Sequence, residues 1–99
     1  MDKKLKARWV KALRSGRYKQ GDGTLKADGR YCCLGVLRQI ADPKDRGFRR
    51  ARASDDNALL SNKQLRRFGL TNKRQNELAE MNDGGQKFPA IADYIEKHL

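Results

Sequence analysis

The chain has 99 residues, 37% of them hydrophobic, and its 23 lysines and arginines outnumber its 12 acidic residues, which gives a net charge of +11. This length predicts one small basic domain over residues 1–99, too small for a large buried enzyme cavity. The chain has no apolar run of about 18 residues and no signal-peptide pattern, so we expect a cytoplasmic protein that does not span a membrane.

The first half of the chain predicts two helices separated by a hairpin. Apolar residues recur at helical spacing over residues 2–14, with Trp9 as the expected core anchor of this first helix. An Asp-Gly dipeptide between short extended segments then predicts a two-residue turn, and hence a short β-hairpin over about residues 23–33. From Cys33 the apolar spacing is helical again, and this second helix should end before Pro43, because the residue preceding a proline avoids the helical region.

The second half begins with a segment that lacks periodicity. Residues 43–60, basic at first and polar afterwards, are predicted to form a mobile loop within the domain. Ser61 and Gln64 resemble a capping box at the start of a short helix that Gly69 ends, and a further helix follows it. The last helix carries Pro89 in its first turn and the clearest amphipathic pattern of the chain. The predicted fold is therefore mainly α (α+β), with four or five short helices and one small β-hairpin.

The stretch RYCCLGVLRQI places Cys32 and Cys33 at the front of an apolar run. Adjacent cysteines rarely bond each other because the ring strains the peptide, and one histidine, His98, leaves too few ligands for structural zinc. A nucleophilic cysteine would need a base, which His98 is poorly placed to supply. We predict that the pair packs where the hairpin meets the helix. A helix N-terminus could lower a thiol pKa, so a Cys-dependent enzyme stays open as an alternative.

The positive charge is unevenly distributed along the chain. Residues 1–20 hold eight basic side chains against one acidic, residues 43–53 hold five against one, and residues 61–76 hold five and none. Such a surface favours a polyanionic partner, although a charged face that only confers solubility explains the same counts. The predicted nucleic-acid- or anion-binding residues are Arg46, Arg49, Arg50, Arg52, Arg66, Arg67, Lys73 and Arg74.

Four of these residues, from Arg66 to Arg74, flank a glycine-containing connection between two short helices. Helix–turn–helix DNA readers share this arrangement, and an ordinary helical hairpin with a charged outside explains it more simply. A second cluster combines basic residues, an aromatic ring and nearby glycines, which together can hold a phosphorylated nucleotide. This alternative nucleotide pocket comprises Arg14, Arg17, Tyr18, Lys19 and Arg30.

Three segments of the chain carry a resemblance: WVKALRSGRYKQGDGTL, GRYCCLGVL and FGLT…LAEMNDGGQKFPAIADYIE. In this order they resemble a group of short uncharacterised proteins encoded by tailed bacteriophages and prophages, over about 70 of the 99 residues. YCCLGVL and MND-G-x-x-F-x-x-IA-x-x-I are the more specific patterns. Such relatives continue YCCLGVL with another cysteine where this chain has Arg38, which weakens a metal-binding interpretation further. The resemblance implies a phage origin and action inside a bacterial host, and no activity of individual residues.

These observations predict a small non-enzymatic protein, without metal or cofactor, that acts in the bacterial host by binding a polyanion, with nucleic acid as the first candidate. The alternative is a counter-defence protein that blocks an acidic surface of a host immune protein or sequesters a nucleotide signal. A third hypothesis is an enzyme that uses Cys32 or Cys33. The expected partners are thus nucleic acid, an acidic host protein or a phosphorylated nucleotide, and not a membrane.

Overall fold

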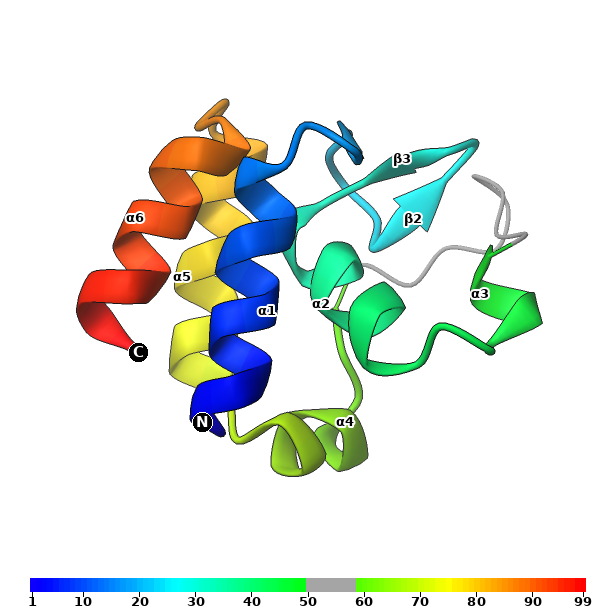
Figure 1. Ribbon diagram of the computed structural model, residues 1–99. Helices are drawn as coiled ribbons and strands as arrows, with labels where there is room; N and C mark the ends of the chain where they lie inside the picture. Colours follow the sequence, from blue (N-terminus) through cyan, green and yellow to red (C-terminus); the bar gives the residue numbers. More distant parts are fainter. Residues whose placement is uncertain (50–58) are drawn as a thin grey trace.

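The computed structural model describes residues 1–49 and 59–99, which form six helices and a small three-stranded sheet (Figure 1). The helices are α1 (Lys3–Arg14), α2 (Cys33–Ala41), α3 (Arg46–Arg49), α4 (Asn62–Phe68), α5 (Asn72–Asp83) and α6 (Phe88–His98). The strands are β1 (Lys19–Gln20), β2 (Lys26–Ala27) and β3 (Arg30–Tyr31). The fold is mainly α with a little β, which confirms the predicted class. Within the described residues, no helix has the length and apolar character needed to cross a membrane.

The core lies where four helices meet. α1 packs between α6 and α2, and α5 runs behind it and contacts both of those helices (Figure 1). Trp9 of α1 is completely buried and its Nε1 donates a hydrogen bond to the Cys33 carbonyl at 2.9 Å, so its predicted role as a core anchor is confirmed. Leu37, Leu78 and Ile91, from the other three helices, are also completely buried. The apolar stripes predicted for these helices therefore all face one shared core.

Local signals set the ends of the helices. The Ser61 Oγ accepts the Gln64 N–H at 3.2 Å, and the Gln64 Oε1 accepts the Ser61 N–H at 3.0 Å, which confirms the predicted capping box of α4. Gly69 ends α4 with a φ of 74°, a left-handed conformation that glycine adopts without a steric cost. The Thr71 hydroxyl then caps α5. The short connection leaves α4 at the bottom of the molecule in Figure 1, beside the lower end of α5.

The small sheet combines the predicted hairpin with one strand that was not predicted. β2 and β3 are antiparallel, with Ala27 opposite Arg30, and the turn residues Asp28 and Gly29 have φ values of 52° and 81°. Two consecutive left-handed residues are typical of the tight turn that an Asp-Gly pair favours, so the hairpin is confirmed. β1 pairs in parallel with β3, with Lys19 opposite Arg30. Two-residue strands are too short to show the alternation by which a strand is recognised.

Helix α3 lies in the segment predicted as a loop. Phe48 is 5% exposed, its ring lies 6.2 Å from that of Tyr31, and the Arg38 guanidinium stacks over it at 4.4 Å. Arg38 also pairs with Asp45 at 3.0 Å, and Asp45 accepts the Phe48 N–H at 3.1 Å. One buried aromatic ring and one ion pair thus hold a helical turn that composition alone did not indicate. The prediction of a mobile loop differs from the structure over 46–49, and residues 50–58 lie outside the described residues.

A buried asparagine joins the sheet to the helices. Asn82, 3% exposed at the end of α5, accepts hydrogen bonds from the Cys33 N–H and the Gln20 Nε2, both at 3.1 Å, and donates to the Gly21 carbonyl at 2.8 Å. The Gln20 Oε1 accepts the Phe88 N–H at 3.0 Å, which ties the start of α6 to the same point. The YCCLGVL and MND-G-x-x-F patterns therefore meet in a structural junction.

Candidate anion-binding surface

The two cysteines lie inside the core at the start of α2. Cys32 is 4% exposed and its Sγ accepts the Gly35 N–H at 3.4 Å, while Cys33 is completely buried and its Sγ donates to the Leu78 carbonyl at 3.6 Å. Burial raises the pKa of Cys32 to about 11 and raises the pKa of Cys33 well above its usual value. Both therefore stay protonated near neutral pH. The prediction that both cysteines pack in the core is confirmed. The expectation that the helix N-terminus lowers a thiol pKa differs from the structure, in which burial raises both pKa values.

Two of the predicted anion-binding residues lie on α4 and differ in their surroundings. The Arg67 Nη1 binds the Asp42 carboxylate at 2.7 Å, so this side chain reaches toward the end of α2 and already has a carboxylate partner. The neighbouring Arg66 is exposed and has no ion pair with the residues that the structure describes. Arg67 is still 57% exposed and can contact a second anion, but its charge is largely balanced.

The other pair, on α5, faces a different neighbour. The Arg74 Nη1 lies 3.0 Å from the Glu77 Oε2 and 2.9 Å from the Tyr94 hydroxyl of α6. Tyr94 also donates to Glu77, and this hydrogen bond, with that of Arg74, lowers the pKa of the Glu77 carboxyl. Lys73 is exposed beside it. Arg67 thus faces α2 and Arg74 faces α6, so these two arginines are turned to different neighbours, whereas a helix–turn–helix reader presents its cations to one surface.

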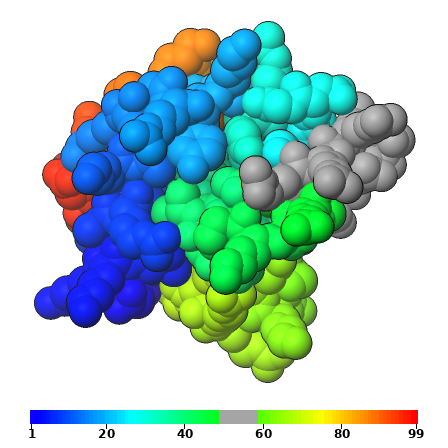
Figure 2. Space-filling model, turned by 45° about the vertical axis from the view of Figure 1, so that its right-hand side comes forward, coloured from blue at the N-terminus to red at the C-terminus, as the bar shows by residue number. Residues whose placement is uncertain are grey.

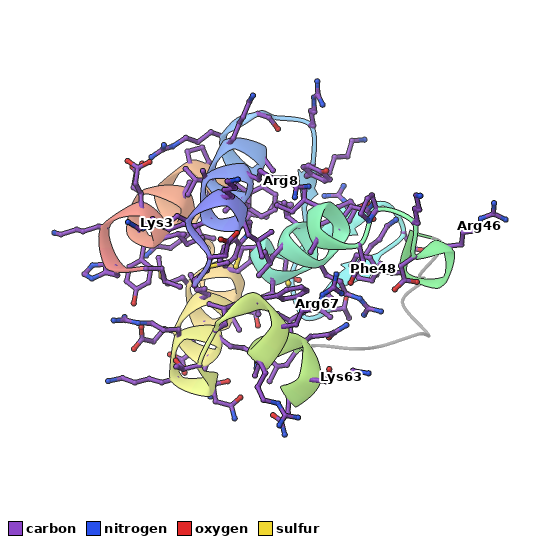
Figure 3. The ribbon with its side chains drawn as sticks, turned by 60° about the horizontal axis from the view of Figure 1, so that its bottom comes forward. Lys3, Arg8, Arg46, Phe48, Lys63 and Arg67 are labelled. Carbon is purple, nitrogen blue, oxygen red and sulfur yellow. The ribbon has the colours of Figure 1, made fainter. Side chains whose placement is uncertain are left out.

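Of the four arginines predicted between residues 46 and 52, two lie within the described residues. Arg46 is exposed on α3, and Arg49 is the last residue of that helix. Arg50 and Arg52 lie outside the described residues. Because Phe48 anchors α3 against the sheet and α2, Arg46 has a defined position at the edge of the molecule (Figure 3).

The five residues of the alternative nucleotide pocket do not form one site. Arg14 makes ion pairs with two carboxylates of α6, at 2.6 and 2.9 Å, and these raise its pKa further. Lys19 is exposed on β1. Arg30 lines a separate cavity of about 470 Å³, where Asp22 and Asp28 also lie. Arg14, Arg30 and the pair Arg17 and Tyr18 therefore line three different cavities. Only Arg17 and Tyr18 remain together.

A different pocket, here called the α1–α2 pocket, brings Arg17 and Tyr18 together with two cations of α1, Arg8 and Lys11. Its volume is about 340 Å³, and none of its lining residues is acidic. The ring of Tyr18 closes one side, held edge-on by Tyr31 with 5.1 Å between the ring centroids and 87° between their planes. The lining residues are Arg8, Lys11, Ala12, Ser15, Arg17, Tyr18 and Ile40.

Hydrogen bonds hold the Arg8 side chain and the backbone of Arg17 at this pocket. The Arg8 Nη2 donates to the Ile40 carbonyl at 2.7 Å, across the gap between α1 and α2. The Ser15 hydroxyl accepts the Arg17 N–H at 3.2 Å and donates back to a carbonyl of α1 at 2.6 Å, which fixes the chain where it leaves the helix. Lys11 lies one turn after Arg8 on the same face of α1.

The α1–α2 pocket belongs to a wider basic surface. Figure 2 shows α1, the chain around the end of α2, and α4 meeting on one face of the molecule. In Figure 3, Arg8, Arg67 and Lys63 follow one another from α1 past α2 to α4, whereas Lys3 lies on the other flank of α1, toward α6. We define the basic face by the pocket cations, by Arg67 and Lys63, and by Arg46, which lies beyond α2 at the outer edge in Figure 3: its members are Arg8, Lys11, Arg17, Arg46, Lys63 and Arg67.

Three members of the basic face were not among the predicted site residues. Arg8 and Lys11 recur three residues apart on a predicted helix and lie just before Arg17, a spacing visible in the sequence. That spacing places them on one face but says nothing about which element packs beside it. Lys63 shows no local signal at all, since an exposed lysine in the first turn of a helix is unremarkable in sequence.

The comparisons with known proteins identify a family for the first part of the chain. A family model matches residues 1–62, and its description is a domain of unknown function (DUF8296). No curated protein and no solved structure matches the chain. The matched residues include α1, the sheet, α2 and α3, and therefore every residue of the α1–α2 pocket.

Proposed function

We propose that this chain, which belongs to the family described as a domain of unknown function (DUF8296), binds polyanions through its basic face, with nucleic acid as the principal ligand. One observation carries the proposal. Of the six cations of the basic face, only Arg67 has a carboxylate partner within residues 1–49 and 59–99. Like charges held on one surface repel each other, and an anionic ligand relieves that repulsion.

The distribution of charge favours an extended ligand over a point-like one. Arg8 lies on α1, whereas Arg67 and Lys63 lie on α4, and the three follow one another across the face, which suits an extended anion better than a small one (Figure 3). The molecule measures 33 × 27 × 23 Å along its principal axes. A face 27 Å wide spans about 8 base pairs of duplex, since the rise is about 3.4 Å per base pair. The acidic side chains of α6 lie beyond α1, on the other flank, which leaves the basic face as the side that attracts a polyanion (Figure 1).

The proposal assigns binding and no chemical step. The two thiols are buried and protonated, and they contribute to the core. Action in the cytoplasm of a bacterial host, which the resemblance to phage proteins implies, is part of the same proposal. Binding of host or phage nucleic acid there requires no further component from this chain.

Salt dependence of binding tests the proposal. Fluorescence polarisation with a labelled 20-base-pair duplex should give a log–log slope of about −5 for six phosphate contacts, a loss of about 10³-fold in affinity between 50 and 200 mM salt. The double variant Arg8→Gln/Lys63→Gln should make the slope shallower by about 2.

A matched control separates the basic face from net charge. The double variant Lys87→Gln/Lys97→Gln removes the same charge from exposed positions at the two ends of α6. It should leave the slope nearly unchanged. Binding that ignores salt, or that falls equally in both double variants, would contradict a role for the basic face.

A further inference from the structure

We propose that the α1–α2 pocket binds the phosphate monoester of a nucleotide, carried either by a free nucleotide or by the end of a nucleic-acid strand. For the strand as its source, this inference rests on the proposed function. It adds a site and a chemical group, because binding along a basic face needs only the phosphodiesters of the backbone.

The charge of the pocket matches a dianion. Arg8, Lys11 and Arg17 surround it, and no carboxylate is among its lining residues. A phosphodiester carries one negative charge, whereas a phosphate monoester carries about 1.5 to 2 near pH 7. Three cations around one concavity exceed what a backbone phosphate balances, and their fields add at that point.

The Arg8 guanidinium and the backbone of Arg17 are held in position before a ligand binds. The bond from the Arg8 Nη2 to the Ile40 carbonyl, at 2.7 Å, uses one of the five N–H donors of the guanidinium. The remaining donors suit a two-point contact with phosphate oxygens. Ser15 fixes the backbone of Arg17 at the end of α1. Groups that are held before binding lose less conformational entropy when the ligand arrives, which favours affinity.

The size and walls of the pocket suit one nucleotide. A volume of about 340 Å³ lies at the lower end of the range for small-molecule sites. Tyr18 is half-buried and its ring is fixed by Tyr31, so it offers a rigid aromatic wall beside the three cations. A ligand whose phosphate reaches the cations can therefore place its sugar or base against this ring.

Two larger cavities lined by described residues lack this combination. The cavity of about 470 Å³ beside Arg30 also holds two aspartates. The cavity of about 810 Å³ between α1 and α6 has four basic lining residues, one of which, Lys11, also lines the α1–α2 pocket, but it contains Glu96, which pairs with Arg14. Carboxylates in both cavities repel a phosphate, so the α1–α2 pocket suits a dianion better than either of them.

Strands that differ only in a terminal phosphate test the inference. The probes are one 12-mer of single-stranded DNA with a 5′-hydroxyl, with a 5′-phosphate or with a 3′-phosphate, followed by fluorescence polarisation, and AMP against adenosine, followed by calorimetry. A phosphorylated end should raise affinity about tenfold or more, as charge-assisted hydrogen bonds do, and AMP should bind where adenosine does not. A preference for the 5′-phosphate or the 3′-phosphate strand shows which strand end supplies the phosphate, and binding of AMP without binding of any strand shows that a free nucleotide supplies it.

Variants separate the pocket from general charge. Arg17→Gln should abolish most of the preference for the phosphorylated end, and Arg17→Lys should keep part of it. Lys63→Gln, which removes the same charge outside the pocket, should weaken all strands and leave their ratio unchanged. Arg17 and Lys63 are both exposed, and the fluorescence of the buried Trp9 verifies that each variant is folded.

Each outcome decides a different point. Equal affinity for all strands without AMP binding overturns the pocket inference, while salt-dependent duplex binding would still support the proposed function. AMP binding that requires Arg17, without strand binding, supports the pocket and overturns the nucleic-acid function. If Arg17→Gln and Lys63→Gln reduce the affinity ratio of phosphorylated to unphosphorylated strand equally, the preference for the phosphorylated end comes from net charge, and the pocket inference is overturned.

Discussion

Gly35, in the first turn of α2, is the position where one methyl group should cost the most stability. A Cβ built on this residue would lie 1.7 Å from the Leu25 carbonyl oxygen and 2.7 Å from its carbon. Leu25 is 1% exposed, and the same oxygen accepts the Cys32 N–H at 3.2 Å. The hairpin therefore rests directly on the helix backbone, and Gly35→Ala must push the two apart.

Three effects set the expected magnitude. Alanine in place of glycine ordinarily stabilises a helix by about 1 kcal/mol. Displacing the Leu25 carbonyl breaks its bond with the Cys32 amide and leaves two buried groups unpaired, at about 1–3 kcal/mol each. Forcing a methyl group into filled space adds about 1–3 kcal/mol. The free energy of unfolding should fall by about 4 kcal/mol, a large part of the 5–15 kcal/mol typical of a domain.

Urea unfolding measures this loss directly. Trp9 is the only tryptophan and is completely buried against the Cys33 carbonyl, so its fluorescence reports the core beside Gly35. The midpoint should fall by about 2 M urea. Gly47→Ala in α3 is the control, because among the described residues its Cβ would meet only the Asp45 Oδ1, at 3.5 Å. An unchanged or raised midpoint for Gly35→Ala would refute the reasoning.

Three further predictions concern the same region. Asn82→Ala removes three hydrogen bonds of a buried side chain and should lower the free energy of unfolding by about 3 kcal/mol. Asn76→Ala, at an exposed position on the same helix, should change it by less than about 0.5 kcal/mol; equal losses in the two variants would contradict a stabilising role for the Asn82 junction. Native Cys32 and Cys33 should react with a thiol reagent at pH 8 at least about 100-fold more slowly than in urea. Because the folded protein retains the Cys32 proton up to about pH 11, against a usual pKa of 9.0, stability should decline between these values, and Cys32→Ser should reduce that decline; fast native labelling would contradict it.

Most helices were predictable because their signals are local. A capping box, a left-handed glycine and a proline in the first turn each act within a few residues, and the structure places Ser61, Gly69 and Pro89 in these roles. The Asp-Gly turn succeeded for the same reason. β1 and α3 were missed because their stability comes from β3 and from the packing of Phe48, not from their own residues.

The site was harder to predict, because the sequence shows where charges are but not whether they are balanced. Arg74 and Glu77 are three residues apart on one helix, so their pairing was visible in principle. The partners of Arg14 and Arg67 were not, since Asp93 is 79 residues from Arg14 and Asp42 is 25 residues from Arg67. No local rule connects residues that far apart.

The sequence by itself determined the fold class, the helix ends, the hairpin and the strongly basic character, because each depends on backbone preferences and composition within short windows. Only the tertiary structure decided which cations remain without a carboxylate and which of them share a pocket. Packing α1 between α6 and α2 assigns Arg14 to carboxylates on one flank and places Arg8 against the Ile40 carbonyl on the other. Whether a basic side chain is available to a ligand depends on the groups that folding brings beside it.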